Sequence, residues 1–235
     1  MTTVALIGPD GAGKTTVAQR LPALLPVPVR YLYMGVSTDS SNVMLPTTRL
    51  ARRLKRALGA PPDTAGPPSH GPRRPRSRSY LRRRVADVRA GLRVGNRLAE
   101  EWYRQWLAWR WTRSGAVVLF DRHFFVDYHA YDVDAAEERS LSQRLHGLVL
   151  GRFYPRPDLV IYLDAPGDVL LARKGEGSVE ALERRRGEYR AIADHVQDFV
   201  EVDATRPVEE VTGAVADVIR SRLSGRGPAP GKRAP

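Results

Sequence analysis

The chain carries, near its amino end, a segment whose residue types and spacing suit the binding of phosphate. Residues 8–16 read GPDGAGKTT, in which Gly8, Gly13, Lys14 and Thr15 match the pattern G-x-x-x-x-G-K-[S/T]. Glycines let main-chain amides approach phosphate oxygens, the lysine ammonium reaches the β and γ phosphates, and the threonine hydroxyl ligates Mg²⁺. The apolar run VALI precedes the segment and a helical pattern follows it. The segment therefore predicts a phosphate-binding loop for a nucleoside triphosphate.

A second segment with chemistry-bearing residues is VVLFDRH, at 117–123. Asp121 and Arg122 follow an apolar strand pattern, and in a parallel sheet ligands bind at the edge where the strands end. Asp121 is expected to face the metal or the attacking oxygen. Arg122 is expected to hold an anionic acceptor or the migrating phosphoryl group, whose spread negative charge suits a guanidinium fork.

These residues need a scaffold in which strands alternate with helices. Apolar strand patterns occur at 4–8, 29–34, 116–120, 158–164 and 200–202, and helical patterns at 15–25, 50–58, 80–115, 137–150, 179–197 and 208–223. Such alternation implies right-handed crossovers. The expected fold is α/β, a P-loop NTPase three-layer sandwich with a parallel five-stranded sheet and helices on both faces.

The charge of the 235-residue chain is concentrated in one region. Residues 49–97 contain 15 lysines and arginines against two aspartates, whereas the rest of the chain holds 23 basic and 24 acidic residues. Within that region, 59–79 is rich in Pro, Gly, Ser and Arg, so a basic, mobile insertion is expected. The expected organisation is one P-loop domain over 1–223, a loop at 37–49 where an acceptor could lie, and a disordered tail at 224–235.

The chain contains no cysteine, which excludes disulfides and thiolate metal sites and is compatible with a reducing compartment. Any metal is expected to arrive with a substrate. No window approaches the roughly 18 uninterrupted apolar residues of a membrane-spanning helix, and no signal peptide is evident. A cytoplasmic protein without a transmembrane segment is expected.

The motifs GPDGAGKTT, VVLFDRH and PDLVIYLDAP together resemble the thymidylate kinase group of nucleotide kinases, over residues 3–36 and 98–220. The resemblance implies a magnesium-dependent kinase with ATP as co-substrate, and suggests a homodimer. It implies that Asp10 faces the acceptor nucleotide or a phosphate-holding arginine, that Arg122 binds the acceptor phosphate, and that a lid follows the fourth strand. It also places adenine against the loop DATRP at 203–207, where Ala204 is expected to contact the ring through main-chain atoms.

The lid is one place where the chain departs from that family. Some members carry an arginine in the phosphate-binding loop where this chain has Gly11, so a transition-state cation must come from elsewhere. Arg173 and Lys174, directly after a helix and before Gly175, are the chosen lid cations, because a hinge glycine lets both close over the triphosphate. The run Arg184–Arg186 is interpreted as a solvated helix face.

The acceptor region is the second departure, because HFFVDYHAYD lacks the usual continuation of the Asp-Arg motif. Thymidylate specificity therefore does not transfer, and Asp127 contacts acceptor hydroxyls or caps a turn or helix. Trp102, Trp106 and Trp109 recur at i, i+4 and i+7, which favours core packing. The functional alternative is that one of them or Tyr103 stacks an acceptor base. His123 is expected to form a wall of the pocket.

The residues expected to bind ATP are Gly8, Asp10, Gly11, Ala12, Gly13, Lys14, Thr15, Thr16, Arg173 and Ala204. Those expected to take part in phosphoryl transfer are Lys14, Asp121, Arg122, Arg173 and Lys174, with Thr15 and Asp121 on Mg²⁺. Those expected to bind the acceptor are Asp10, Arg122, Asp127 and Tyr103.

The leading hypothesis is transfer of the ATP γ-phosphoryl group to a nucleoside monophosphate-like acceptor. One alternative is a sugar, nucleoside or natural-product hydroxyl as acceptor, with Asp121 as general base. Another is a polyanion-binding or nucleic-acid-binding ATPase that uses the basic region, although a region with Tyr80 as its one aromatic residue has no base-stacking pattern. Weak docking of LARRLKRAL, at 50–58, on an anionic membrane is a third.

Overall fold

A computed structural model describes residues 2–34, 43–57, 80–123, 147–149, 151–175 and 177–225. Three expectations fall wholly or largely outside these residues: the proline- and arginine-rich part of the insertion at 59–79, most of the helix at 137–150, and the tail. Asp127 also lies outside them. In the part that is described, no helix is both long enough and apolar enough to cross a membrane.

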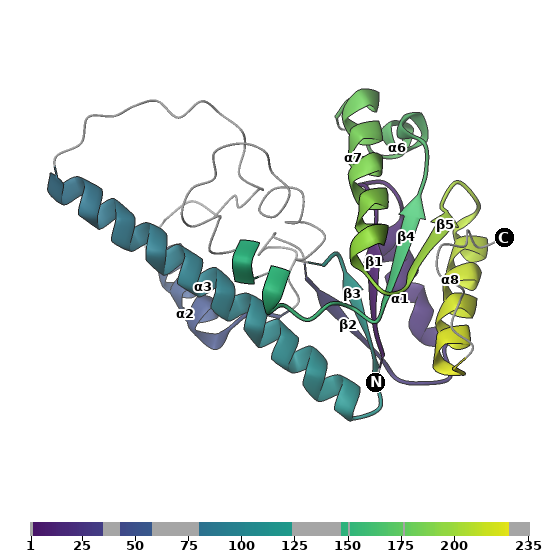
Figure 1. Cartoon of the computed structure of the whole chain (residues 1–235), viewed down its shortest axis with the longest axis horizontal. Helices are drawn as coiled ribbons and strands as arrows, with labels where there is room; N and C mark the ends of the chain where they lie inside the picture. The colour runs from purple at the N-terminus through teal and green to yellow at the C-terminus, as the bar shows by residue number, and fades with distance from the viewer. Residues whose placement is uncertain are drawn as a thin grey trace.

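Five parallel strands form one sheet, which confirms the expected α/β fold (Figure 1). The strands are β1 (Thr2–Ile7), β2 (Val29–Tyr33), β3 (Val117–Asp121), β4 (Leu159–Asp164) and β5 (Phe199–Asp203). Their order in the sheet is β2-β3-β1-β4-β5. β1 is thus central and pairs with β3 on one side and β4 on the other, in a register that places Leu6 opposite Asp121.

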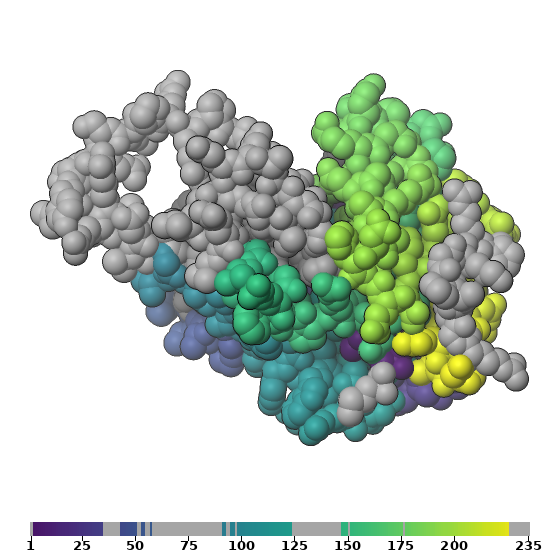
Figure 2. Space-filling view, in the orientation of Figure 1, coloured from purple at the N-terminus to yellow at the C-terminus, as the bar shows by residue number. Residues whose placement is uncertain are grey.

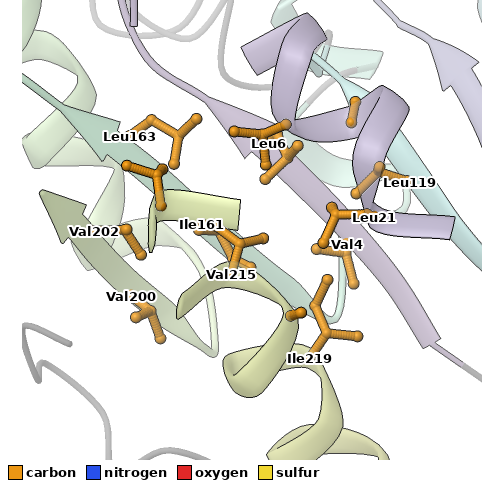
Figure 3. Close-up of a cluster of buried hydrophobic side chains, with 14 of the residues drawn as sticks. Val4, Leu6, Leu21, Leu119, Ile161, Leu163, Val200, Val202, Val215 and Ile219 are labelled. Carbon is orange, nitrogen blue, oxygen red and sulfur yellow. The ribbon is translucent and has the colours of Figure 1, made fainter. Parts of the chain in front are cut away.

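Helices cover the sheet in two layers, because alternate strand residues point to opposite faces. The helices are α1 (Lys14–Arg20), α2 (Pro46–Ala57), α3 (Tyr80–Arg113), α6 (Gly167–Lys174), α7 (Val179–Ala191) and α8 (Val208–Leu223), with 3₁₀ turns η1 (Leu21–Ala23) and η3 (Ile192–His195). Val4 and Leu6 pack with α1 and α8 in one cluster, shown in Figure 3. Ala5 and Ile7 pack with α3 and α7 in the other.

The strand order creates a crevice beside the phosphate-binding segment. From β1 the chain passes to β2 on one side of the central strand, and from β3 it passes to β4 on the other side. The connections that leave the neighbouring strands β1 and β3 therefore run in opposite directions across the sheet. In open α/β sheets, ligands bind in the crevice between two strands whose connections separate in this way. The segment after β1 meets Asp121, the last residue of β3, and the following Arg122 there.

Several element boundaries differ from those expected from sequence. The helix after the glycine segment ends at Arg20 and tightens into η1, which contains Pro22. The polar loop expected at 37–49 becomes α2 from Pro46 onward, so the basic region begins inside a helix. α3, by contrast, follows the helical pattern expected at 80–115, including Gly91 and Gly95, and ends at Arg113.

The expectation that the tryptophans of α3 belong to the core is wrong. Trp102, Trp106 and Trp109 are 44%, 47% and 50% exposed, whereas Glu101 and Arg104 on the inward face are almost fully buried. The spacing correctly places the three indoles on one side of the helix. It does not determine which side packs on the sheet, because that depends on contacts with other elements.

Candidate functional site

The glycine segment adopts a loop that only glycine permits at two of its positions. Gly8 and Gly13 have φ angles of 145° and 87°. A Cβ atom on Gly8 would lie 2.5 Å from the carbonyl oxygen of Leu163, at the end of β4. Gly13 occupies the left-handed N-cap position of α1, with nothing within 4 Å of where its Cβ would stand. Glycine is therefore required by packing at Gly8 and by backbone conformation at Gly13.

Lys14, the first residue of α1, folds back over the loop. Its buried ammonium group donates hydrogen bonds to the carbonyl oxygens of Gly8 at 2.7 Å and Pro9 at 2.8 Å. These bonds hold the positive charge at the loop itself. An anion that enters the loop would meet this charge without a large rearrangement of the main chain.

Thr15 and Asp121 are brought together although 106 residues separate them. The Thr15 hydroxyl donates to Oδ2 of Asp121 at 3.0 Å, and the Tyr31 hydroxyl donates to the same oxygen at 2.7 Å. Burial and the hydrogen bond to Asp121 raise the pKa of the Tyr31 phenol well above its ordinary value, so this hydroxyl remains a donor. Sequence reasoning missed Tyr31. Its position on a strand that ends at the same sheet edge as Asp121 was the available signal.

Arg122 leaves β3 in a conformation that turns its side chain toward the loop. Its φ angle of 64° lies in the left-handed region, which non-glycine residues seldom adopt, and its main-chain N–H donates to Leu6. Backbone strain of this kind concentrates at functional sites. The guanidinium group of Arg122 donates to the carboxylate of Asp10.

Asp10 is the centre of a cluster of positive charges. Besides Arg122, the ammonium groups of Lys174 and Lys14 lie 3.5 Å and 3.8 Å from its carboxylate oxygens. Burial by itself would raise the pKa of Asp10, but the charges of Arg122, Lys14 and Lys174 outweigh burial and hold that pKa below its ordinary value. Three cations are therefore already gathered around an anion at this point.

Arg173 and Lys174 are the last two residues of α6, so the expectation that they directly follow the helix is wrong by two residues. Gly175 then ends the helix in the left-handed conformation, with a φ angle of 71°. The Arg173 guanidinium group donates to the carbonyl oxygens of Ala204 at 2.8 Å and Thr205 at 3.4 Å. Arg173 therefore joins the end of α6 to the loop after β5.

Two hollows adjoin along the glycine loop. The first, of about 550 Å³, is lined by charged and hydroxyl-bearing side chains that include Lys14, Thr15, Tyr31, Asp121 and Arg122. The second, of about 540 Å³, has an apolar wall from the start of α8 that includes Pro207 and Val208. Both hollows are lined by Gly11, Gly13, Thr16 and Arg173. One charged compartment and one partly apolar compartment thus meet at the loop.

Ala204 lines the second hollow, but both of its main-chain groups already have partners within the protein. Its N–H donates to the Asp164 carbonyl at 2.7 Å and its carbonyl accepts from Arg173. Asp203 fixes the turn by accepting from the main-chain N–H and the hydroxyl of Thr205. The loop is therefore shaped before any ligand arrives.

A partly buried ion-pair network, which sequence reasoning missed, holds α7 and α6 against the sheet. The Arg186 guanidinium donates from Nε and a terminal nitrogen to the two oxygens of Asp164, at 2.8 Å and 2.7 Å, and also bonds Glu183. Glu183 in turn accepts from the main-chain N–H of Gly167, at the start of α6. The interpretation of Arg186 as solvated is wrong, because the helix turns it toward the end of β4. Arg184 is exposed, as expected.

Replacing Arg186 with alanine should destabilise the fold. Burial would raise the pKa of Asp164, but hydrogen bonds from Arg186 and Tyr162 hold that pKa below 3.8. A lowered native pKa contributes stability above the unfolded value, and this contribution is lost as pH falls through the native value. Denaturant unfolding should show a loss of about 1–3 kcal/mol at neutral pH. The loss should shrink as pH falls below about 4, where Asp164 of the unfolded chain becomes protonated, and should be smallest below the lowered native pKa.

Arg184→Ala is the matched control, since it removes an exposed arginine from the same helix and should change stability by less than about 0.5 kcal/mol. An equal loss for both variants, or a loss for Arg186→Ala that does not depend on pH, would contradict the network.

Tyr103 and His123, two further residues expected at the site, line neither of these hollows. Tyr103 stacks on Trp106, with ring centroids 6.1 Å apart, and does not line either hollow. Its role in acceptor binding stays a prediction. His123 is fully buried between the rings of Phe120 and Tyr154 rather than in a hollow wall, and burial lowers its pKa to about 3. It therefore stays neutral and carries no charge for the site.

Among the described residues no group of three or more histidine, aspartate or glutamate side chains is arranged to hold a metal ion by itself. The oxygens of Thr15 and Asp121 instead form a pair at the loop. A scan of the chain against protein-family models found no match.

Proposed function

We propose that the chain is a magnesium-dependent kinase with a P-loop NTPase fold, which transfers the γ-phosphoryl group of ATP to a phosphate-bearing, nucleoside monophosphate-like acceptor. One observation carries the proposal. The hydroxyl of Thr15 and the carboxylate of Asp121 lie 3.0 Å apart beside the buried Lys14, in a hollow that also contains Arg122, Arg173 and Lys174. A P-loop hydroxyl and a carboxylate from a neighbouring strand are the residues that hold Mg²⁺ on a triphosphate in P-loop NTPases.

The two hollows suggest how ATP lies. The triphosphate would occupy the charged hollow along Gly11 and Gly13, with Lys14 on its β and γ phosphates. The adenine ring would lie in the second hollow against Pro207 and Val208, since flat apolar walls suit a nucleobase. Arg173, which lines both hollows, would contact the chain of phosphates where the two meet.

The donor set fits magnesium. Mg²⁺ usually takes one or two protein oxygens and completes its shell with water and substrate phosphates, so a pair of oxygen donors is what such a site needs. Thr15 and Asp121 supply that pair. When bound, the ion would neutralise charge on the phosphates and so lower the barrier to transfer.

The contacts of Asp121 favour a phosphate acceptor over a hydroxyl acceptor. Oδ2 of Asp121 already accepts hydrogen bonds from the hydroxyls of Thr15 and Tyr31, which suits a metal ligand better than a general base. Asp10 is also a poor base, because the cations around it lower its pKa. A phosphate monoester needs no base, because its oxygen is already ionised at neutral pH.

Transfer then depends on position and charge. An ionised oxygen of the acceptor phosphate attacks the γ-phosphorus. The new P–O bond forms as the bond to the β,γ-bridging oxygen breaks, and ADP leaves with the electron pair. Arg122, Lys14 and Lys174, which now surround Asp10, would bind phosphate oxygens and hold the two reactants in line.

A panel of acceptors tests this function. ATP and Mg²⁺ are incubated with nucleoside monophosphates, sugar phosphates, nucleosides and sugars, and ADP release is measured with ³¹P NMR of the products. At least one phosphate monoester should accelerate ADP release and yield a diphosphate. Acceleration by hydroxyl acceptors alone would favour the alternative acceptor class, and no acceleration by any compound would refute kinase activity.

Tyr31→Phe should weaken metal use without disturbing the strand. The variant removes the 2.7 Å hydrogen bond that orients Asp121 and leaves the ring in place. Loss of such an outer-shell partner typically costs tenfold to a hundredfold, so kcat/KM at low Mg²⁺ should fall by roughly that factor. Saturating Mg²⁺ should restore most of the rate. An equal deficit at every Mg²⁺ concentration would show that Tyr31 does not act through the metal site.

A further inference from the structure

The helix α3 buries polar side chains while large aromatic side chains on it stay half exposed. Glu101, Arg104 and Gln105 are almost fully buried, whereas Trp102, Trp106 and Trp109, along the flank of the same helix, are 44% to 50% exposed. Single exposed apolar residues are common, but a row of large aromatic side chains marks a surface that binds something. The exposed row of three tryptophans therefore suggests a binding surface.

Arginines lie directly against this tryptophan row. The guanidinium carbon of Arg113 is 4.0 Å from the ring centroid of Trp109, and that of Arg110 is 5.7 Å from the ring centroid of Trp106. We name these five residues, Trp102, Trp106, Trp109, Arg110 and Arg113, the Trp–Arg face. Indoles partition to the boundary between water and lipid, and guanidinium forks match phosphate oxygens, so this combination fits a phospholipid headgroup layer.

The neighbouring helix α2 repeats the combination of basic and apolar residues. It carries Arg49, Arg52, Arg53, Lys55 and Arg56 and no acidic residue. Its Leu50 and Leu54 are 60% and 56% exposed. The Thr48 hydroxyl donates a hydrogen bond to Asn96 of α3, so this side of α2 faces α3. Successive residues of an α-helix are about 100° apart, which places Leu50 and Leu54 about 200° and 240° around α2 from Thr48. Both leucines therefore point away from α3.

We propose that the Trp–Arg face and the leucine face of α2 dock on an anionic phospholipid membrane. In Figure 2 α2 lies at the lower left of the molecule, and the later part of α3 continues from there along the bottom, away from α7 and α8. Basic residues next to apolar ones are the composition of helices that lie in the membrane interface. This inference does not rest on the proposed kinase function.

Charge argues for a membrane over a second copy of the chain. Residues 49–97 hold 15 basic residues and two acidic ones. Self-association through α2 and α3 would bring two such segments toward each other, and like charges facing each other disfavour a complex. An anionic leaflet instead attracts each Lys and Arg that comes near its surface.

The aliphatic side chains argue for a membrane over a nucleic acid. Single-stranded nucleic acids bind by stacking bases on aromatic rings, which the tryptophans could provide. Leu50, Leu54 and Leu92 are also strongly exposed, however, and an aliphatic side chain offers no stacking surface. Burial in hydrocarbon favours all six side chains.

Intrinsic fluorescence reports directly on this surface. All four tryptophans of the chain lie on α3, and the fourth, Trp111, packs against the inner core cluster. The full chain is mixed with vesicles of phosphatidylcholine, with or without phosphatidylserine, and emission and co-sedimentation are measured. Vesicles with phosphatidylserine should shift the emission to the blue and pellet the protein. Pure phosphatidylcholine should do neither.

Salt and substitution sharpen the test. Binding should be largely lost at about 1 M NaCl, where the Debye length is only about 3 Å. Trp106→Ser with Trp109→Ser should weaken partitioning roughly tenfold or more, because two indoles no longer enter the interface. Arg20→Ser removes an exposed basic residue of α1, on another helix, and should leave partitioning unchanged. Thermal unfolding midpoints confirm that all variants fold.

Three results would overturn the proposal. One is no pelleting with either vesicle, or equal pelleting with both. Another is a blue shift that grows with protein concentration without vesicles and coincides with a dimer mass in light scattering, which would assign the face to a second copy. The third is quenching by a single-stranded oligonucleotide without vesicle binding, which would assign it to nucleic acid.

Discussion

Replacing Lys14 with methionine is expected to lower kcat/KM for ATP roughly a hundredfold to a thousandfold, the usual cost of removing one preorganised charge-stabilising donor. The Lys14 ammonium is buried at the loop and bonded to the carbonyls of Gly8 and Pro9. Methionine keeps most of the stem volume but carries no charge. The loss should appear in ADP release and in the thermal shift caused by ATP.

Arg20→Met is the matched control for this prediction. Arg20 ends the same helix, α1, and its guanidinium forms an exposed ion pair with Glu209 at 2.6 Å. Removing it deletes one positive charge outside both hollows and costs at most about 1 kcal/mol of stability. ATP should therefore stabilise this variant as it stabilises the wild type. If both variants, or neither, lose the response to ATP, Lys14 does not hold the triphosphate.

Replacing Asp121 with asparagine is expected to produce a loss of similar size, roughly a hundredfold or more in kcat, because the proposed metal ligand becomes neutral. The fold should survive. An asparagine can turn its side-chain oxygen toward the hydroxyls of Thr15 and Tyr31, which now donate to Oδ2 at 3.0 Å and 2.7 Å. A titration of the rate with Mg²⁺ should show a midpoint moved to higher concentration.

Asp158→Asn provides a chemically matched control at the other edge of the sheet. Asp158 also accepts a threonine hydroxyl, from Thr3 at 2.8 Å, but it precedes β4 instead of following a strand. Its neutralisation should leave the Mg²⁺ dependence unchanged. An Asp121→Asn variant with wild-type Mg²⁺ dependence would remove the metal site from the proposal.

Much of the fold followed from local pattern alone. The run VALI, the glycine segment and the following helical pattern are neighbours in the chain, so their chemistry can be recognised without knowing the fold. The apolar runs before Asp121 and Asp164 indicated buried parallel strands, and parallel strands bring their carboxyl ends to one edge. The meeting of Lys14, Thr15, Asp121 and Arg122 was therefore expected.

The partners of these residues could not be predicted, because they depend on contacts between distant segments. Tyr31 reaches Asp121 across 90 residues, and Arg186 reaches Asp164 from a helix whose sequence is consistent with a solvated face. Side-chain length and the rotation of each helix decide such contacts, and neither is encoded in spacing.

The tryptophans of α3 show the same division most clearly. Their spacing by itself determined that Trp102, Trp106 and Trp109 share one side of a helix, since an α-helix repeats every 3.6 residues. Only the tertiary structure decided that this side stays half exposed, because Glu101, Arg104 and Ala108 are the residues that the packed face of α3 buries. Periodicity shows which residues share a face, whereas the packing of the whole chain determines which face is buried.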